Sequence, residues 1–379
     1  MIKIGITGQA GFVGTHLYNT LHLHTGKYAS IPFEDEFFRD KIQLESFVSE
    51  CDIIVHLAAM NRHNDPEVIY QTNIGLVTQL IEAMEKTNST PHVLFSSSTQ
   101  EERDNHYGRS KREGRDLLEK WAFRNNARLT CLVIPNVFGP FGNPYYNSVI
   151  ATFCHQLTHN EIPKIVTDGE IKLIYVAELV GEIVERIDRM QRLPAGEPAI
   201  EVIQVPHTSR IFVSELLALL QDIKSNYFEK GEIPALGNLF NLNLFNTFLT
   251  YIDHAAFFPF KLKLNTDQRG SFIETIKLNS GGQVSFSTTV PGITRGNHYH
   301  TRKAERFAVI KGKALIQLRR IGTDKVLNFK LSGDQPAFVD MPVWFTHNIT
   351  NIGNEELYTI FWINEHYNPL DGDTFFETV

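Results

Sequence analysis

The chain has few cysteines and no long apolar run, and both shortages limit what it can be. Its 379 residues include three cysteines, Cys51, Cys131 and Cys154, which are widely spaced and form no Cys-x-x-Cys pair. That number and spacing exclude a disulfide framework. No apolar stretch approaches the ~20 residues that a membrane-spanning helix requires. The N-terminus runs directly into a strand-like pattern without the shape of a signal peptide. We therefore expect a soluble, cytoplasmic protein.

Charge of one sign is not concentrated anywhere in the sequence. Lys and Arg number 36 against 43 Asp and Glu, which gives a net charge of −7. A mildly acidic chain without a block of Lys and Arg does not fit a nucleic-acid-binding protein. Hydrophobic residues at 42% and charged residues at 21% are ordinary for globular proteins and exclude a wholly disordered chain. At about 150 residues per domain, the length predicts roughly two domains.

Two kinds of pattern divide the chain. Up to about residue 240, short apolar runs alternate with longer segments of helical spacing, which is typical of βαβ units around a parallel sheet. After about residue 255 the runs are short and separated by turns, which predicts an all-β barrel or sandwich. The predicted domains are residues 1–245 and 255–379. We interpret 239–260, rich in Phe, Leu and Asn without a clear period, as a crossover whose aromatic rings pack between the domains.

Glycines spaced by three follow the first predicted strand. Gly8, Gly11 and Gly14 lie where this strand gives way to a helix. Glycine allows the backbone to approach a pyrophosphate closely, and a helix N-terminus favours the charge of that group. A glycine-rich turn without a ligand is the alternative interpretation.

A tyrosine and a lysine further along have the spacing of a reductase site. Tyr107 and Lys111 are four positions apart, so they share one face of a helix. A Tyr hydroxyl can give a proton to a carbonyl oxygen as hydride arrives at the carbon, and a nearby Lys ammonium favours the phenolate. A serine of the run 96–98, at the end of a predicted strand, can hydrogen-bond the same oxygen. Each piece alone is also common on ordinary surface helices and turns.

In this order and at these separations, the pieces resemble the extended short-chain dehydrogenase/reductase family, which acts on nucleotide sugars. Segments 52–59 and 135–140 fit its cofactor-side loop and its substrate-side turn, so that the resemblance covers roughly residues 1–240. It implies a Rossmann-type, doubly wound parallel sheet, with Ser98, Tyr107 and Lys111 as the catalytic residues. The cofactor-binding residues that it implies are Gly8, Gly11, Phe12, Val13, Gly14, Leu57, Ala58 and Lys111. Ser98 and Tyr107 are closer in sequence than in many relatives, which predicts a more open site.

The residues that follow the glycines bear on whether the dinucleotide is NAD or NADP. An acidic residue ~20 positions beyond the glycines usually bonds the ribose 2′-hydroxyl of NAD, whereas an arginine suits NADP. Glu34, Asp35 and Glu36 come first here, with Arg39 and Lys41 behind them. The residues themselves favour NAD.

The C-terminal part contains a spaced set of imidazoles and one carboxylate. His298 and His300 face the same side of a strand, Glu305 is expected to return on the neighbouring strand, and His347 comes later. Three imidazole nitrogens and a carboxylate suit Zn²⁺, and also Fe²⁺, Mn²⁺ or Ni²⁺. We expect one divalent ion, foremost Zn²⁺, in this set.

The spacing of these ligands is that of a cupin barrel. Gly-x5-His-x-His-x4-Glu-x6-Gly, from Gly292 to Gly312, matches the first cupin motif. Residues 342–351 resemble the second motif, with Trp344 in place of its glycine, and we expect Trp344 to fill part of the barrel mouth. The alternative is a cupin that keeps its ligands but binds no metal.

Nearly end to end, the chain resembles the CapF family of bifunctional capsular polysaccharide enzymes. The further stretches that carry this resemblance are 61–62, 147–153, 267–272, 291–300, 346–349 and 362–365. It implies that the cupin epimerises a UDP-4-keto-2-acetamido-2,6-dideoxyhexose at its 3-position. The reductase domain would then reduce the 4-ketone to UDP-2-acetamido-2,6-dideoxy-L-talose, on the route to UDP-N-acetyl-L-fucosamine.

The same resemblance implies a cofactor and an assembly. The family uses NADPH, whereas the acidic residues after the glycine loop favour NADH. We follow the resemblance and expect NADPH, with NADH as the alternative. The resemblance also implies a homodimer formed through the cupin, a UDP-sugar substrate, and neither a nucleic-acid nor a membrane partner. The alternative function is a dTDP- or UDP-sugar 4-ketoreductase whose cupin only dimerises and binds sugar. Arg295, Asn297 and Tyr299 lie near the metal ligands in sequence, and none is singled out as the epimerisation base.

Overall fold

The computed structural model describes residues 1–191, 199–268 and 270–379, which form two compact units. The first unit comprises Met1–Thr152 and Gly169–Phe212, and the second comprises Phe153–Asp168 and Val213–Val379. A short segment from the first half of the chain thus belongs with the C-terminal unit. The division of the chain into domains 1–245 and 255–379 stays a prediction. Within the described ranges, no helix combines the length and apolar character needed to cross a bilayer.

A six-stranded parallel sheet forms the centre of the first unit, in the order β2-β1-β3-β4-β5-β8. The strands are β1 Ile2–Thr7, β2 Tyr28–Ile31, β3 Ile53–His56, β4 His92–Ser98, β5 Arg128–Ile134 and β8 Ala199–Gln204. Strands β3, β4 and β5 are buried at nearly every residue because helices cover both faces of the sheet. The chain turns from β1 to β2 on one side and to β3 on the other, so the loop after β1 lies at the topological switch point, where such folds bind ligands.

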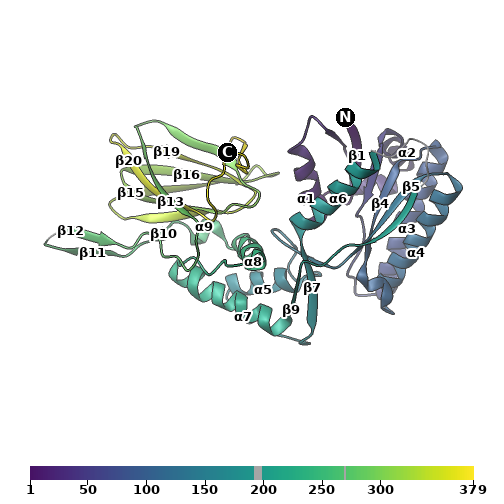
Figure 1. The fold of residues 1–379 in the computed structure, drawn as a ribbon, viewed down its shortest axis with the longest axis horizontal. Coiled ribbons are helices and arrows are strands. Elements are labelled where there is room, and N and C mark those ends of the chain that lie inside the picture. Colours follow the sequence, from purple (N-terminus) through teal and green to yellow (C-terminus); the bar gives the residue numbers. More distant parts are fainter. Residues whose placement is uncertain (192–198, 269) are drawn as a thin grey trace. The chain divides into compact units, whose positions relative to one another are not determined.

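Helices cover both faces of this sheet. On one face lie α1 (Phe12–His22) and α6 (Val176–Gln191), and on the other lie α2 (Lys41–Glu50), α3 (Pro66–Thr87) and α4 (His106–Arg124) (Figure 1). Two 3₁₀ turns, Asp35–Arg39 and Thr99–Glu102, precede α2 and α4. A small sheet contains β6 (Asn136–Phe138), β7 (Glu170–Tyr175) and β9 (Ser209–Phe212). The predicted Rossmann-type, doubly wound α/β fold is confirmed.

Two five-stranded sheets form the barrel of the second unit, in the orders β10-β18-β15-β20-β13 and β17-β16-β19-β14-β21. The strands of the first sheet are β10 Phe260–Lys261, β13 Gln283–Thr289, β15 Glu305–Lys311, β18 Ala337–Met341 and β20 Leu357–Ile363. Those of the second sheet are β14 Thr294–Tyr299, β16 Lys313–Arg320, β17 Val326–Ser332, β19 Phe345–Asn351 and β21 Phe375–Phe376. All pairings within them are antiparallel, which confirms the predicted all-β cupin fold. A hairpin of β11 (Leu264–Asp267) and β12 (Gly270–Ile273) projects from this barrel (Figure 1).

Helices lie in the segment that we interpreted as a crossover. Residues 239–260 contain α8 (Leu239–Leu249) and α9 (His254–Phe257), which follow α7 (Val213–Ile223) and a π-helical turn (Lys224–Phe228). Helix α5 (Val149–Thr158) runs from one unit into the other. The sequence of this segment shows no clear period because α8 is buried at seven consecutive positions, Asn243 to Leu249, which removes the one-sided apolar pattern that marks a surface helix.

The aromatic rings of this segment pack inside the second unit. Phe245 lies edge-on against Tyr227 with ring centroids 5.1 Å apart. Tyr227 in turn donates its hydroxyl to Asp340 at 2.5 Å, and Asp340 accepts two hydrogen bonds from the Arg306 guanidinium at 2.8 and 2.9 Å. Arg306 and Asp340 are both buried. Removing one partner of a buried ion pair lowers the free energy of unfolding by about 3–5 kcal/mol. The Arg306–Asp340 pair, with Tyr227 bonded to it, therefore holds the helical segment against the barrel.

Candidate active site and metal centre

The loop after β1 comes close to itself and to the loop after β3. Gly8 has a φ of +71°, and a Cβ there would lie 2.9 Å from the backbone of Ala58. A Cβ on Gly14 would lie 2.2 Å from the carbonyl oxygen of Gly8. Gly11 precedes α1 without a capping side chain, and the first turn of α1 has no acidic residue. The close approach and the uncapped helix N-terminus fit a pyrophosphate group.

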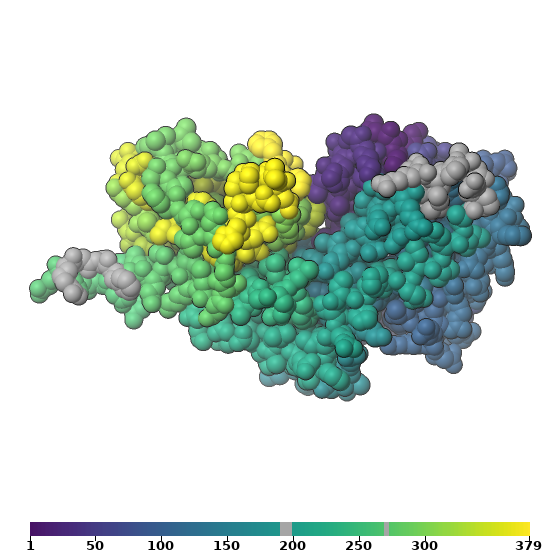
Figure 2. Space-filling model, in the orientation of Figure 1, coloured from purple at the N-terminus to yellow at the C-terminus, as the bar shows by residue number. Residues whose placement is uncertain are grey.

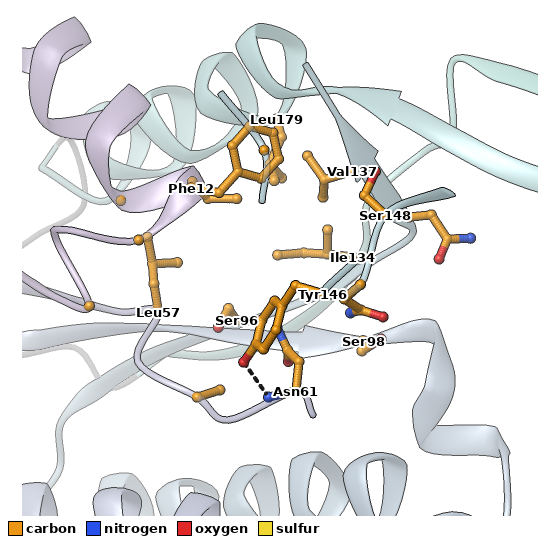
Figure 3. A pocket seen from close by; sticks show the side chains of 18 of the residues that line it. Phe12, Leu57, Asn61, Ser96, Ser98, Ile134, Val137, Tyr146, Ser148 and Leu179 are labelled. Atoms are coloured by element: carbon orange, nitrogen blue, oxygen red, sulfur yellow. Dashed lines mark hydrogen bonds between the residues drawn. The ribbon is translucent and has the colours of Figure 1, made fainter. Parts of the chain in front are cut away.

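A cavity of about 390 Å³ opens at this loop in the first unit (Figure 3). The predicted residues that line it are Gly8, Gly11, Phe12, Val13, Gly14, Leu57, Ser98, Tyr107 and Lys111. Of the predicted cofactor residues, Ala58 is missing from this lining, and Ala59 lines it instead. The structure therefore brings the glycine loop, the serine and the Tyr–Lys pair to one cavity, although they are up to about 100 residues apart in sequence.

Helix α4 presents Tyr107 and Lys111 to the cavity. Asn105 caps the helix by accepting the Gly108 N–H at 2.7 Å. The Lys111 ammonium donates to the carbonyl of Ser96 at 2.8 Å and lies 5.7 Å from the centre of the Tyr107 ring. Burial lowers the pKa of Lys111 to about 7 and raises the pKa of Tyr107 above its usual range. Tyr107 is thus a neutral phenol at physiological pH and can donate its proton.

The three serines at the end of β4 have different partners. Ser96 donates to the carbonyl of His56 at 3.0 Å, and Ser97 donates to the carboxylate of Glu101. Ser98 accepts the N–H of Gln100 at 3.2 Å, and no acceptor for its own hydroxyl hydrogen is found in the described part of the chain. This arrangement favours Ser98 as the hydrogen-bond donor to a substrate. The 3₁₀ turn Thr99–Glu102 fills the short gap to α4.

Sequence reasoning missed two residues of this site as well as one behind it. The Tyr146 hydroxyl accepts the Asn61 N–H at 3.1 Å, and its ring lies inside the cavity (Figure 3). Asn73 holds the loop that carries Asn61, because its carboxamide bonds both the N–H and the carbonyl of Met60 at 2.7 and 3.0 Å. It also donates to Ser110 of α4 at 3.0 Å. The signal for Asn73 was its place on the apolar stripe of α3, where a buried amide needs partners.

The acidic cluster lies outside the lining of the cavity. Glu34 precedes the 3₁₀ turn that contains Asp35, Glu36 and Arg39, and none of these residues lines the cavity at the glycine loop. The preference between NAD and NADP therefore stays a prediction.

In the second unit, the barrel brings together the four predicted metal ligands. The Nε2 atoms of His298, His300 and His347 lie 4.0, 3.3 and 3.0 Å from Oε2 of Glu305. One ligand atom from each of the four residues lies within 4.8 Å of all the others. Ligands at ~2.0–2.2 Å from a tetrahedral Zn²⁺ are roughly 3.3–3.6 Å apart, so the ion would require only small shifts, with His298 moving closer to Glu305 and His347 slightly away from it.

The hydrogen bonding of these four side chains leaves their ligand atoms available for a cation. Within the described residues, Nε2 of His300, Nε2 of His347 and Oε2 of Glu305 are buried without a well-directed hydrogen-bond partner. Nδ1 of His300 lies 2.5 Å from the Asp373 carbonyl and Nδ1 of His347 lies 3.1 Å from the Phe345 carbonyl, which leaves each Nε2 as the unprotonated nitrogen. Burial lowers the pKa of His298 to about 4, so its imidazole is neutral as a ligand must be. The donor set fits a zinc ion.

One detail of this centre differs from the sequence-based expectation. Glu305 begins β15, which belongs to the sheet opposite that of β14, so it reaches the histidines across the barrel and not from a neighbouring strand. Trp344 has a φ of +63°, which is why the motif has glycine there. Its ring stacks on Tyr299 with centroids 5.7 Å apart.

Comparison with known proteins finds a family model for each of the two parts of the chain. Residues 4–198 match the NAD dependent epimerase/dehydratase family, and residues 265–375 match the polysaccharide biosynthesis C-terminal domain. The first match covers about half of the chain. This chain is therefore an enzyme of the NAD dependent epimerase/dehydratase family that carries a polysaccharide biosynthesis domain.

Matches over the whole chain narrow the family. The UDP-2-acetamido-2,6-beta-L-arabino-hexul-4-ose reductase of Pseudomonas aeruginosa is 32% identical over 378 residues, 99% of this chain and 98% of that protein. The crystal structure of the capsular polysaccharide assembling protein CapF from Staphylococcus aureus is 35% identical, with a TM-score of 0.62 and all of both chains covered. The spore coat polysaccharide biosynthesis protein SpsL of Bacillus subtilis is 26% identical over 123 residues, 30% of this chain and 82% of that protein. The chain belongs to the CapF family, as the sequence predicted.

Proposed function

We propose that the first unit reduces the 4-ketone of a UDP-linked 2-acetamido-2,6-dideoxyhexose. The observation that carries this proposal is the meeting of Ser98, Tyr107 and Lys111 with the glycine loop at one cavity. The full-length similarity to a UDP-hexulose reductase supports the choice of substrate. The proposed product is UDP-2-acetamido-2,6-dideoxy-L-talose, on the route to UDP-N-acetyl-L-fucosamine for capsule or O-antigen polysaccharide.

Each residue of the trio has a role in this reduction. NADPH, bound along the glycine loop and the residues Phe12, Val13, Leu57 and Ala58, would supply the hydride. The Ser98 hydroxyl hydrogen-bonds the ketone oxygen, and the Tyr107 phenol gives that oxygen its proton. Lys111 favours the phenolate that remains, because a nearby cation lowers the pKa of a phenol. Positioned proton donation of this kind contributes about 10²–10⁴-fold to a rate.

We further propose that the barrel epimerises the sugar at its 3-position before the reduction. A ketone acidifies the neighbouring C–H bond, and this activation disappears once the 4-ketone is reduced, so the order of the steps follows from the chemistry. His298, His300, Glu305 and His347 would hold Zn²⁺, which supplies Lewis-acid polarisation or structural support. The alternative, a 4-ketoreductase with a barrel that only dimerises and binds sugar, predicts no exchange at the 3-position.

The proposed enzyme is a cytoplasmic homodimer joined through its barrel. Strand β13 lies at the edge of its sheet, and two of its outward side chains, Val284 and Phe286, are 53% and 68% exposed. Within the described residues β13 pairs only with β20, and a free sheet edge with apolar side chains suits pairing with a second copy of the chain. Light scattering coupled to gel filtration should give twice the monomer mass of 43.2 kDa.

One assay tests both activities. The protein is mixed with the UDP-4-keto-6-deoxy-HexNAc substrate and NADPH or NADH, and the product is identified by NMR. A parallel reaction in D₂O without the dinucleotide reports deuterium exchange at the 3-position. Reduction with exchange, and a higher kcat/KM for NADPH than for NADH, are expected. Reduction without exchange would establish the alternative, and a higher kcat/KM for NADH would assign the acidic cluster to the ribose.

A further inference from the structure

The C-terminal segment runs along the metal centre in the second unit. Strand β21 pairs with β14, and this pairing places Phe376 opposite His298 and Phe375 opposite Tyr299. Just beyond it, the N–H of Glu377 donates to the carbonyl of Asn297 at 3.0 Å. The C-terminal residues, in yellow, lie on the surface of this unit (Figure 2). The edge strand that carries His298 is thus closed by residues about 75 positions further along the chain.

Asp373 is the residue of this segment with the densest contacts. Its carboxylate accepts the backbone N–H groups of Thr301, Arg302 and Lys303 at 3.2, 3.0 and 3.2 Å. It also accepts the Thr301 hydroxyl at 2.6 Å. Asp373 is 7% exposed. One buried carboxylate therefore binds the whole turn that joins His300 to Glu305.

The backbone of Asp373 contacts a metal ligand directly. Its carbonyl lies 2.5 Å from Nδ1 of His300, the nitrogen that faces away from the donor cluster. Asp373 has a φ of +41°, a conformation that residues other than glycine rarely adopt. This conformation lets the carbonyl reach His300 while the carboxylate reaches the following turn. Such a conformation persists where the surrounding contacts over-determine it, and it clusters at functional sites.

We propose that Asp373 is a positioning residue for the metal centre, an inference that rests on the proposed metal site. Its carbonyl selects the His300 tautomer and orients the ring, and its carboxylate fixes the turn that sets the separation of His300 and Glu305. The partners of a ligating imidazole commonly change metal affinity by 10–100-fold when they are altered. Asp373 touches none of the donor atoms and contributes through two ligands at once.

The first test compares Asp373→Asn with a matched control on the same segment. Asp371→Asn removes the same charge two residues earlier, from a side chain that is 63% exposed and pairs only with the side chain of Arg302 in the described contacts. Zinc affinity is measured by competition with a chromophoric chelator. Asp373→Asn should weaken zinc binding by about tenfold or more, and Asp371→Asn should stay within about twofold of wild type. Equal affinities for the two variants would overturn the proposal.

A cobalt spectrum separates positioning from general destabilisation. Co²⁺ bound to Asp373→Asn should show visible bands altered in position and intensity, because the turn between His300 and Glu305 loses its charged acceptor and the two ligands shift relative to one another. Thr301→Val removes only the hydroxyl bond to Asp373 and serves as the milder variant if Asp373→Asn does not fold. It should weaken zinc binding by a few-fold. Wild-type zinc affinity and an unchanged Co²⁺ spectrum in Thr301→Val would contradict a positioning role.

Amide hydrogen exchange tests the same contacts without any metal. In metal-free protein, Asp373→Asn should speed exchange in peptides that cover residues 300–305, because three of their N–H groups lose a charged acceptor. Asp371→Asn should not. If wild type binds no zinc but this difference is seen, the metal site fails while the ordering of the turn by Asp373 stands. If exchange is unchanged, the proposal fails even where zinc binds.

Discussion

Substituting Gly14 by alanine tests whether the glycine loop is built for close approach. The new Cβ would lie 2.2 Å from the carbonyl oxygen of Gly8 and 2.8 Å from that of Gln9, both of them backbone atoms. Real Cβ atoms do not approach backbone oxygen so closely, so the loop must move away from α1. We expect the loop to lose the shape in which Gly8 packs against Ala58.

The size of the effect follows from two opposing contributions. Overpacking costs about 1–3 kcal/mol, whereas alanine is better than glycine inside a helix by about 1 kcal/mol. The net destabilisation of Gly14→Ala is therefore about 0–2 kcal/mol. Gly75 in α3 is the matched control, because a Cβ there meets nothing within 4 Å. Gly75→Ala should stabilise the protein by up to about 1 kcal/mol.

Dinucleotide binding should respond much more than stability. The shifted loop no longer offers its backbone to the pyrophosphate, and a loss of 1.4 kcal/mol already weakens binding tenfold. NADPH binding by isothermal titration and unfolding in urea are measured for both variants. We expect at least tenfold weaker NADPH binding in Gly14→Ala and wild-type binding in Gly75→Ala. NADPH binding by Gly14→Ala within threefold of wild type would refute the assignment of this loop.

Three other changes probe the remaining sites. Tyr107→Phe should lower kcat for ketone reduction by about 10²-fold or more while 3-position exchange in D₂O continues; undiminished NADPH oxidation would remove Tyr107 from the mechanism. His298→Ala with His300→Ala should abolish zinc binding and 3-position exchange but leave NADPH binding unchanged, and full exchange in this variant would make the ion structural only. Burial lowers the pKa of both His56 and His92 to about 3, so the unfolded chain takes up protons that the folded chain does not. The free energy of unfolding should therefore fall by about 1.4 kcal/mol per pH unit for each histidine as the pH drops below 6.5, a slope that urea titrations should find shallower in His92→Gln.

The strands and ligands that the sequence predicted share a local signature. The apolar runs at residues 2–6, 52–57 and 129–135 fall on β1, β3 and β5, because buried parallel strands are continuous apolar runs. The four metal ligands are recognisable because strand alternation and fixed spacing are local properties of the chain. The Tyr–Lys pair on α4 was predictable for the same reason.

Contacts between distant segments leave no such signature. Asp373 is one of several acidic residues near the C-terminus, and nothing near it in sequence indicates that it bonds residues 301–303. Asn61 and Tyr146 meet only because the loop after β3 and the segment before α5 border one cavity. The spacing of apolar residues reports which face of a single helix or strand is buried. Contacts such as that between Asn61 and Tyr146 depend instead on where two distant elements end in space.

Strand β15 shows why even a correctly predicted strand can hide its function. Glu305 points into the barrel toward the three histidines, and the next residue, Arg306, points to the other face. Arg306 is buried as well, because Tyr227 and the carbonyl of Gly231 cover that face and join it to Asp340. A charged residue at an outward position normally indicates solvent, so the burial of this face is not visible in the sequence alone. The helical segment that covers this face removes the alternation of buried and exposed side chains. One short strand thereby carries a candidate metal ligand on one side and, on the other, the buried arginine that bonds the helical segment.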